Sequence, residues 1–242
     1  MIEFKNVSKK YHTKEVLKAQ SFTIQDGEFV VLVGPSGSGK TTLLKMINRL
    51  IEPTSGEIMI DGKPQSQLSL RQMRFEMGYV LQQASLFPNM TVLENTLIIP
   101  KLKRLDLTQA TLDAKKLLHQ VGLDESTYHK YPKELSGGEQ QRVGIVRALM
   151  GNPKILLMDE PFSALDAITK KELQALIKDL QRQLQLTVVF VTHDTTEALK
   201  LADRVAVLHQ GELVQFAKPD TIIKNPADAF VADLFKEEIA HA

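Results

Sequence analysis

Residues 34–41 read Gly-Pro-Ser-Gly-Ser-Gly-Lys-Thr and match the pattern G-x-x-x-x-G-K-[ST] in full. Loops with this pattern bind phosphate, because their backbone N–H groups wrap the anion, the lysine reaches its outer oxygens and the last hydroxyl can ligate Mg²⁺. We expect Lys40 to stabilise charge on the phosphates and Thr41 to bind the metal. The pattern predicts a nucleotide-binding site formed by Gly34, Pro35, Ser36, Gly37, Ser38, Gly39, Lys40, Thr41 and Thr42.

Two carboxylates end a short apolar run: residues 155–158 read ILLM, and Asp159 and Glu160 follow. Such a run is typical of a buried strand, and ligands of open α/β sheets bind beyond the carboxyl ends of these strands. We expect Asp159 to hold Mg²⁺, directly or through water, and Glu160 to orient or deprotonate an attacking water. Two acidic residues alone are more often part of a solvated loop, but the phosphate-binding loop favours the catalytic interpretation.

A second anion-binding pattern lies at residues 135–142, LSGGEQQR. A Ser-Gly-Gly turn at the start of a helix exposes backbone N–H groups that no helical carbonyl satisfies, and such groups bind anions. The residues of this candidate site are Leu135, Ser136, Gly137, Gly138, Glu139 and Gln140. The chain therefore carries two candidate phosphate sites, although one bound nucleotide does not require both.

Hydrophobic patterning indicates the elements that must position these residues. Alternating or continuous apolar residues predict strands at 2–7, 19–24, 29–33, 57–60, 155–158, 188–191 and 205–208. Helical spacing predicts helices at 41–50 and 170–184, and a mostly helical stretch from 70 to 150. Asp26-Gly27 and Asp61-Gly62 are each typical of a hairpin turn.

Strands that alternate with helices favour an α/β fold with a mostly parallel sheet. We predict a P-loop nucleoside-triphosphatase core of this class, an antiparallel β subdomain at its N-terminal end, and a helical insertion that carries LSGGEQQR. The whole chain, 1–242, is expected to be a single nucleotide-binding domain. Its core and β subdomain would occupy 1–69 and 151–242, and its helical subdomain about 70–150.

The composition excludes several classes of protein. The chain has no cysteine, and therefore no disulfide, thiolate metal site or cysteine nucleophile. A net charge of +1 provides no broad electrostatic attraction to nucleic acid. The start, MIEFKNVSKKY, lacks the apolar segment of a signal peptide, and no apolar run approaches the ~18 residues that a membrane span needs. We expect a chain that is cytosolic or that is bound to a membrane through something other than a span of its own.

The ordered set of motifs resembles the nucleotide-binding subunit of ATP-binding cassette (ABC) transporters over nearly the whole chain. The motifs are the loop at 34–41, LSGGEQQR, ILLMDE, SALD at 163–166 and His193. The resemblance implies that ATP and Mg²⁺ bind, and that ATP hydrolysis drives transport across a membrane.

The same resemblance implies roles for five residues that indicate no function by themselves. Tyr11 would stack on adenine, and Val16 would contact the same base. Gln82 would sense Mg²⁺, the γ-phosphate and the membrane partner. Asp166 would lie in a loop at a dimer interface, and His193 would contact the γ-phosphate and hold Glu160 and water in place.

The resemblance also accounts for the second phosphate site. In that family two copies face each other head to tail, and the phosphate loop of one copy and the LSGG of the other enclose one ATP. Ser136 and the amides of Gly137 and Gly138 would meet the partner's γ-phosphate. The implied partners are a second copy of this chain, integral membrane permease subunits and, through the permease, a substrate-binding protein. The chain would be peripheral on the cytoplasmic face of the membrane, with no nucleic acid partner.

Glu139 departs from the family's commonest signature, LSGGQ. A glutamate is nearly isosteric with glutamine but adds a negative charge near a polyphosphate. We expect slightly weaker nucleotide-driven closure, with function retained because Ser136 and both glycines are present.

Two stretches narrow the expected cargo. LFPNMTVLEN at 86–95 is similar to importers that receive cargo from a binding protein, and MINRLI at 46–51 resembles ATPase subunits for glycine betaine, choline and related osmoprotectants such as carnitine. We therefore expect uptake of a quaternary amine. A polar amino acid importer, an exporter ATPase and a non-transport cassette ATPase of the DNA repair or chromosome type stay open as alternatives. Many osmoprotectant relatives carry C-terminal regulatory domains, and none is expected in a chain that ends at Ala242.

Overall fold

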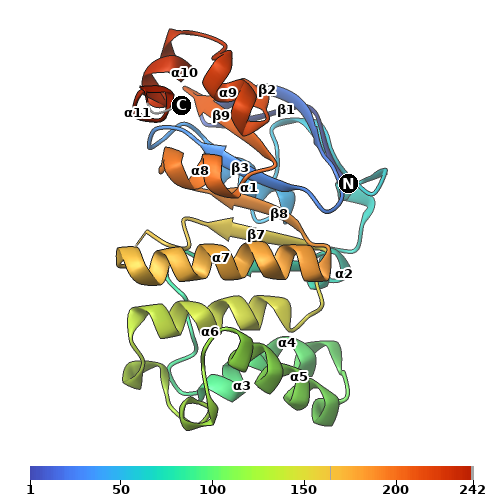
Figure 1. Cartoon of the computed structure of the whole chain (residues 1–242). Coiled ribbons are helices and arrows are strands. Elements are labelled where there is room, and N and C mark those ends of the chain that lie inside the picture. Colours follow the sequence, from blue (N-terminus) through green and yellow to red (C-terminus); the bar gives the residue numbers. More distant parts are fainter. Residues whose placement is uncertain (164, 241–242) are drawn as a thin grey trace. The chain divides into compact units, whose positions relative to one another are not determined.

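The computed structural model describes residues 1–163 and 165–240 (Figure 1). The chain divides into two compact units. Unit 1 consists of Met1–Met73 and Gln185–Ala242, and unit 2 of Arg74–Leu184. The middle of the chain is therefore inserted into a unit that both ends of the chain build together.

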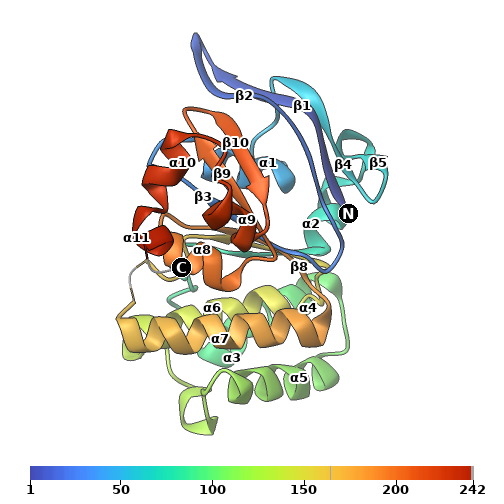
Figure 2. The same ribbon diagram turned by 45° about the horizontal axis from the view of Figure 1, so that its top comes forward.

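Unit 1 contains an antiparallel sheet with the strand order β2-β1-β4-β5. Its strands are β1 (Ile2–Tyr11), β2 (Lys14–Ile24), β4 (Ser55–Ile60) and β5 (Lys63–Pro64), and β1 and β2 form the long ribbon seen in Figure 2. Ile60 pairs with Lys63, which confirms the hairpin predicted at Asp61-Gly62.

A second sheet in unit 1 has the strand order β10-β9-β3-β8. β3 (Phe29–Val33) runs parallel to both β8 (Thr187–Val191) and β9 (Arg204–His209), while β10 (Glu212–Ala217) is antiparallel to β9. All five residues of β3 and of β8 are buried, because strands in a parallel sheet are covered on both faces. The continuous apolar runs in the sequence record this burial.

The turn at Asp26-Gly27 corrects one prediction. It forms no hairpin, because β2 belongs to the antiparallel sheet and β3 to the parallel one. The backbone N–H of Gly27 donates to Thr187 Oγ1 (3.0 Å), so the turn leads the chain from one sheet to the other. β3 is apolar on both faces and buries more surface between β8 and β9 than in a hairpin.

Short helices complete unit 1. They are α1 (Lys40–Ile47), the 3₁₀ helix η1 (Gln65–Gln67), α8 (Thr195–Leu201), α9 (Pro219–Lys224), α10 (Ala229–Leu234) and α11 (Lys236–Ala240), and α2 (Leu70–Phe75) spans the boundary between the units. In the part of the chain that the structure describes, no helix has both the length and the apolar composition to cross a membrane.

Unit 2 pairs two parallel strands and packs helices around an apolar core. Its elements are β6 (Met77–Val80), α3 (Val92–Thr96), α4 (Ile98–Lys103), α5 (Leu107–Gln120), η2 (Glu125–Thr127), η3 (Pro132–Glu134), α6 (Gly137–Leu149), β7 (Ile155–Asp159) and α7 (Ala167–Leu184). The core includes Val92, Leu118 and Val143, and both views show α6 and α7 lying side by side (Figures 1 and 2).

The predicted fold class is confirmed: a parallel α/β core, an antiparallel N-terminal sheet and a helical insertion that carries residues 135–142. β6 lies within the stretch from 70 to 150 that was predicted to be mostly helical. It is a strand because each of its four residues pairs with β7, nearly eighty positions further along the chain. Periodicity within a short window does not contain that partner.

Candidate functional site

The phosphate-binding loop predicted at 34–41 joins β3 to α1 in unit 1. Gly39 is the N-cap residue of α1 with a φ of 104°, and a Cβ there would lie 2.5 Å from Leu17 Cδ2. A Cβ on Gly34 would lie 2.0 Å from the carbonyl oxygen of Leu208. Only glycine fits at these two positions. The glycine spacing therefore reflects a loop pressed between β2 and the end of β9.

Lys40 holds the loop from inside. Its ammonium donates to the carbonyl oxygens of Gly34 (2.7 Å) and Pro35 (2.9 Å), and the residue is only 5% exposed. A desolvated positive charge gains more from an anionic oxygen than from neutral carbonyls. Lys40 thus shapes the loop and brings a positive charge to it.

The side chain of Ser38 is buried in the loop, and within the described part of the chain its Oγ has no hydrogen-bond partner. An unsatisfied buried hydroxyl costs about 1–3 kcal/mol. Gly39 has no side chain with which to cap the N–H groups at the start of α1. A phosphate would accept hydrogen bonds from both, so the loop fits the phosphates of a nucleotide.

The rest of the predicted loop lies around this centre. Pro35, Ser36 and Gly37 are exposed, while Thr41 and Thr42 are half-buried in the first turn of α1. The loop therefore has an open outer side and a floor formed by Ser38 and Lys40.

Val16 and Tyr11, both expected to contact adenine, lie on β2 and at the end of β1. The carbonyl oxygen of Val16 lies 3.1 Å from the position of a Cβ on Gly39, which places Val16 beside the loop. Tyr11 is 43% exposed, and the ammonium of Lys9 lies 4.8 Å from its ring centre. An exposed aromatic ring of this kind can stack on a base.

His193 follows the end of β8 and is exposed. The backbone N–H of Thr192 donates to the carbonyl oxygen of Leu32 on β3 (3.1 Å). Because β3 and β8 are parallel, their carboxyl ends share one edge of the sheet. Unit 1 therefore brings His193 and the phosphate-binding loop to the same edge, where α/β sheets bind ligands.

In unit 2, Asp159 is the last residue of β7, which extends one residue beyond the strand predicted at 155–158. The hydroxyl of Tyr79, on the neighbouring strand β6, donates to Asp159 Oδ2 at 3.4 Å. Burial and the Asp159 charge raise the pKa of the Tyr79 hydroxyl, so it stays protonated and donates. Sequence reasoning missed Tyr79, because only the pairing of β6 with β7 brings it to the carboxylate.

Glu160 has a left-handed backbone with a φ of 46°. Residues other than glycine rarely adopt this conformation, and those that do concentrate at functional sites. The strained position ends β7 at Asp159 and starts a turn, in which the carbonyl oxygen of Glu160 accepts a hydrogen bond from Ser163 Oγ (3.1 Å).

Gln82 lies next to this turn. Its side-chain amide donates to Ser163 Oγ at 3.2 Å, and Ser163 in turn donates to Glu160. Two motifs that are far apart in the sequence, the glutamine and the acidic pair, are therefore joined by one serine. Ser163 was not assigned to the site from sequence, and its place in SALD was its only signal.

The signature segment begins with a capping box on α6. The amide of Glu139 donates to Ser136 Oγ (3.3 Å), and the Glu139 carboxylate accepts from the Ser136 backbone N–H (2.7 Å). The hydrogen bond that the carboxylate accepts from the Ser136 backbone N–H holds the pKa of Glu139 below its ordinary value, so the group is charged at neutral pH. Gln140 ties the segment down by donating to the carbonyl oxygens of Pro132 and Leu135.

Gly137 and Gly138 differ in what surrounds them. A Cβ on Gly138 would lie 2.9 Å from Thr169 Cγ2, whereas a Cβ on Gly137 would meet no atom of residues 1–163 or 165–240 within 4 Å. The packing of the described residues of unit 2 therefore accounts for Gly138 and does not account for Gly137. Asp166 lies in the same region and accepts from the backbone N–H groups of Ile168 and Thr169 (both 3.1 Å), which keeps its pKa low.

These residues surround a hollow of about 530 Å³ in unit 2. Its lining includes Ser136, Gly137, Glu139 and Asp166. Ala164, the second residue of SALD, lies outside the described residues. The hollow has room for part of a phosphate chain over the first turn of α6.

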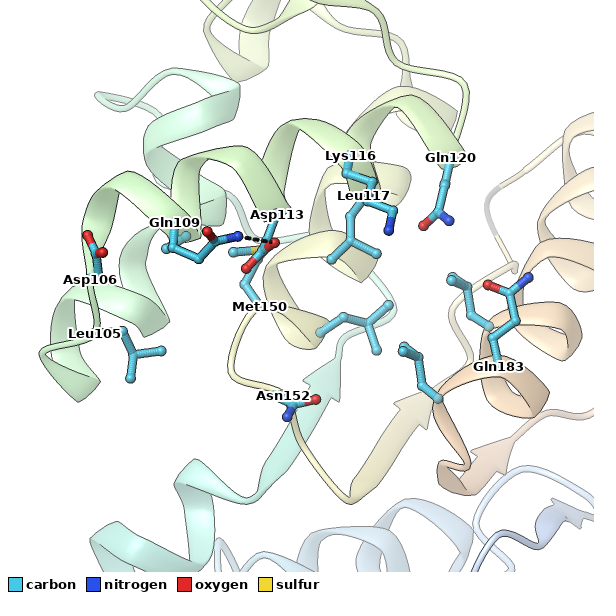
Figure 3. Close-up of a pocket in the computed structure, with 14 residues that line it drawn as sticks. Leu105, Asp106, Gln109, Asp113, Lys116, Leu117, Gln120, Met150, Asn152 and Gln183 are labelled. Atoms are coloured by element: carbon cyan, nitrogen blue, oxygen red, sulfur yellow. Dashed lines mark hydrogen bonds between the residues drawn. The ribbon is translucent and has the colours of Figure 1, made fainter.

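A second hollow in unit 2, of about 550 Å³, lies between α5 and the ends of α6 and α7 (Figure 3). Leu105, Leu117 and Met150 line it together with polar groups, and Gln109 donates to Asp113 at 3.0 Å. It has no glycine in its lining and only one lysine, Lys116. Its chemistry is that of a mixed groove and not of a phosphate site.

No metal cage is present in residues 1–163 and 165–240: no three histidine, cysteine or acidic side chains there come together to hold an ion. Mg²⁺ usually binds one or two protein carboxylates together with the phosphates of a substrate and water. Thr41 and Asp159 offer an oxygen of the required kind, and Gln82 an amide oxygen.

The family model described as ABC transporter matches residues 17–163, which include the phosphate-binding loop, the signature segment and the acidic pair. The chain belongs to the ABC transporter family. This cassette is also similar along nearly its whole length to curated proteins of that family.

Three relatives illustrate the similarity. The choline transport ATP-binding protein OpuBA of Bacillus subtilis is 48% identical over 98% of this chain. The glycine betaine/carnitine/choline transport ATP-binding protein OpuCA of the same organism is 47% identical over 98% of the chain, and each match covers 63% of the relative. The glycine betaine uptake system ATP-binding protein YehX of Escherichia coli is 43% identical over 97% of the chain and 76% of its own length. The chain thus spans less than two thirds of the first two relatives.

Solved structures give the same result for the fold. The dimeric structure of MJ0796, a bacterial ABC transporter cassette, superposes with a TM-score of 0.82 at 38% identity, covering 90% of this chain and 99% of the other. The cassette cbiO1 of Clostridium perfringens, part of the ABC transporter complex cbiONQ, has a TM-score of 0.86 at 26% identity, covering 99% and 97%.

Proposed function

We propose that this chain hydrolyses ATP as the nucleotide-binding subunit of a membrane importer for a quaternary amine. The observation that carries the ATP assignment is the buried Ser38 hydroxyl, which lacks a partner within the described residues at the centre of a loop of the phosphate-binding type. A bound phosphate would accept the hydrogen bond that this hydroxyl can donate. The domain that performs this reaction comprises residues 1–242.

Unit 1 binds the nucleotide in this proposal. Tyr11 and Val16 contact the base, and the loop at 34–42 holds the phosphates. Lys40 exchanges carbonyl oxygens for phosphate oxygens and stabilises the charge that develops on the γ-phosphate as its bond to the β-phosphate breaks. His193 contacts the same phosphate from the end of β8.

Unit 2 contributes the acidic residues. Glu160 orients the attacking water and takes its proton. The left-handed backbone of Glu160, and the hydrogen bonds that connect its carbonyl oxygen to Gln82 through Ser163, hold its main chain in place. Mg²⁺, when bound with ATP, would be held by Thr41, Asp159 and Gln82 and would neutralise charge on the phosphates. Tyr79 keeps Asp159 oriented.

The signature segment acts on the nucleotide of a second copy. Gly137 supports this part of the proposal, because no described residue of its own unit accounts for the missing side chain. A helix start that lacks a side chain lets an anion approach the backbone N–H groups closely. Two copies that bind each other's ATP would separate after hydrolysis, and this change would drive a permease in the membrane.

The names of the relatives support the cargo. They describe transport of choline, carnitine and glycine betaine, all of which carry a quaternary ammonium group. We propose that the chain lies peripherally on the cytoplasmic face of the membrane, bound to permease subunits that receive cargo from a binding protein.

Uptake of labelled glycine betaine at high osmolarity tests the proposal. Cells would carry the native transporter with this subunit, its Lys40→Ala variant or the control Lys45→Ala, which removes a lysine from the last turn of the same helix. We expect uptake to fall to background with Lys40→Ala and to persist with Lys45→Ala. Equal uptake in all three would refute the cargo, and unchanged ATP binding by purified Lys40→Ala protein would refute the phosphate site.

A further inference from the structure

Helix α11, near the C-terminal end of unit 1, contacts the first turn of α8 through one carboxylate. Glu238 accepts hydrogen bonds from the hydroxyls of Thr195 (2.5 Å) and Thr196 (3.2 Å). The shorter distance is typical of a hydroxyl that donates to a charged oxygen, the stronger class of hydrogen bond. The two helices lie near each other in both views of the chain (Figures 1 and 2).

The first turn of α8 is also the segment that fixes His193. Asp194 is the N-cap residue of α8 and accepts from the backbone N–H of Glu197 (3.0 Å). The hydroxyl of Thr192 donates to the Glu197 carboxylate and accepts from the backbone N–H of Asp194 (3.1 Å). The residues on both sides of His193 are thus bonded to α8 or to each other, so a shift of the start of α8 moves the histidine.

The inner side of α8 is held by packing. Ala198 is fully buried, Leu201 is 2% exposed and Glu197 is 4% exposed. The outer side of its first turn carries Thr195 and Thr196, which are more exposed and meet Glu238. The first turn of α8 is therefore held on its inner side by packing against the core and on its outer side by hydrogen bonds to Glu238.

Charge favours this attachment. The start of a helix carries a partial positive charge, and a carboxylate there is stabilising. Asp194, Glu197 and Glu238 together surround the start of α8, although none of them is adjacent to another in sequence. The first two belong to the helix itself, and only Glu238 comes from a separate element.

We infer that Glu238 is a positioning residue for His193, and that α11 fixes the orientation of the histidine through Thr195 and Thr196. The inference rests on the proposed function, in which His193 contacts the γ-phosphate. Glu238 itself touches no nucleotide. It acts by reducing the number of positions open to the first turn of α8, so its loss slows hydrolysis more than it weakens ATP binding.

Steady-state ATP hydrolysis by the purified full chain tests the inference, with Glu238→Ala, Thr195→Val and Glu238→Gln as variants. Glu237→Ala is the matched control, since Glu237 is an exposed carboxylate on the same helix. We expect kcat to fall about fivefold to tenfold in Glu238→Ala and Thr195→Val with KM for ATP little changed, as for a misplaced catalytic group. Glu238→Gln keeps an acceptor oxygen and should recover part of the rate.

Two further measurements separate positioning from a merely structural role. In a His193→Ala background, Glu238→Ala should cause no further loss of kcat, because residues that act through one another are not additive. The NMR signal of the His193 ring, assigned by its loss in His193→Ala, should shift or broaden in Glu238→Ala and not in Glu237→Ala.

An independent fall in kcat in the His193→Ala background, or an unchanged His193 signal in Glu238→Ala, would overturn the inference. If the wild-type chain has no ATPase activity above that of Lys40→Ala, the proposed function fails in this assay. The NMR comparison still decides whether α11 positions the histidine.

Discussion

Replacing each signature glycine by alanine should have opposite effects on the stability of the free chain. Both glycines lie within α6, so alanine suits their backbone. At Gly137 the new methyl meets no atom of the described residues within 4 Å, and a glycine-to-alanine change at a compatible site stabilises by about 0.4–1 kcal/mol. We expect the Tm of Gly137→Ala to rise by roughly 1–4 °C for a chain of this size.

Gly138→Ala should do the reverse. Its methyl would lie 2.9 Å from Thr169 Cγ2, and Thr169 is held in the first turn of α7 by the bond of its N–H to Asp166. Overpacking of this kind costs about 1–3 kcal/mol, which corresponds to a Tm lowered by roughly 2–12 °C. Calorimetry of both variants without nucleotide measures the difference directly.

Gly137→Ala, which should stabilise the free chain, should weaken its ATP-dependent binding to a second copy. We would introduce it into Glu160→Gln, which removes the base and is expected to trap the ATP-bound dimer. If a partner's phosphate approaches the start of α6, the methyl meets it at a cost of about 1–3 kcal/mol per site, which lowers the dimer affinity roughly 5- to 150-fold for each of the two sites. Size-exclusion chromatography or analytical ultracentrifugation with ATP and Mg²⁺ gives the dimer fraction.

The combination of outcomes is decisive. A Gly137→Ala chain that is more stable and dimerises normally would refute the claim that this glycine exists for a ligand outside its own unit. A Gly137→Ala chain that is less stable would refute the packing argument. The Glu160→Gln parent is the control, and its failure to dimerise with ATP would refute the head-to-tail arrangement itself.

Two other predictions concern the same segment. Ser136→Arg should abolish most ATP hydrolysis while the monomer still binds ATP at residues 34–41, as measured with a fluorescent nucleotide; loss of binding by the monomer would mean that the segment acts on the nucleotide of its own chain. Glu139→Gln should strengthen ATP-driven dimerisation in the Glu160→Gln background, because it removes a negative charge near the phosphates. The lowered pKa of Glu139 also predicts how stability depends on pH. The contribution of its carboxylate to stability is present above the ordinary pKa of 4.5 and is lost as the pH falls through the lowered value. The Tm advantage of wild type over Glu139→Gln should therefore shrink on acidification, and a constant difference would contradict the capping role.

The sequence by itself determined the elements that a local pattern of residue types specifies. β3 is predicted at its observed bounds, because five consecutive apolar residues are buried on both faces. The phosphate-binding loop is equally explicit, since Gly34 and Gly39 occupy positions that accept no side chain. Asp159 is at the strand end that the sequence indicates. At these sites local chemistry and the fold require the same residues.

Only the tertiary structure decided how residues far apart in sequence act together. β6 is a strand because of β7, and this pairing alone brings Tyr79 to Asp159. The strain at Glu160 and its link through Ser163 to Gln82 have no sequence signature.

Glu238 shows the same limit most clearly. It lies in a short polar helix, and the role that we propose for it depends on two threonine hydroxyls more than forty positions earlier in the chain. A sequence pattern records the chemistry of a segment and its immediate neighbours. Contacts across the fold depend on how the sheets and helices pack, and only the folded chain contains that information.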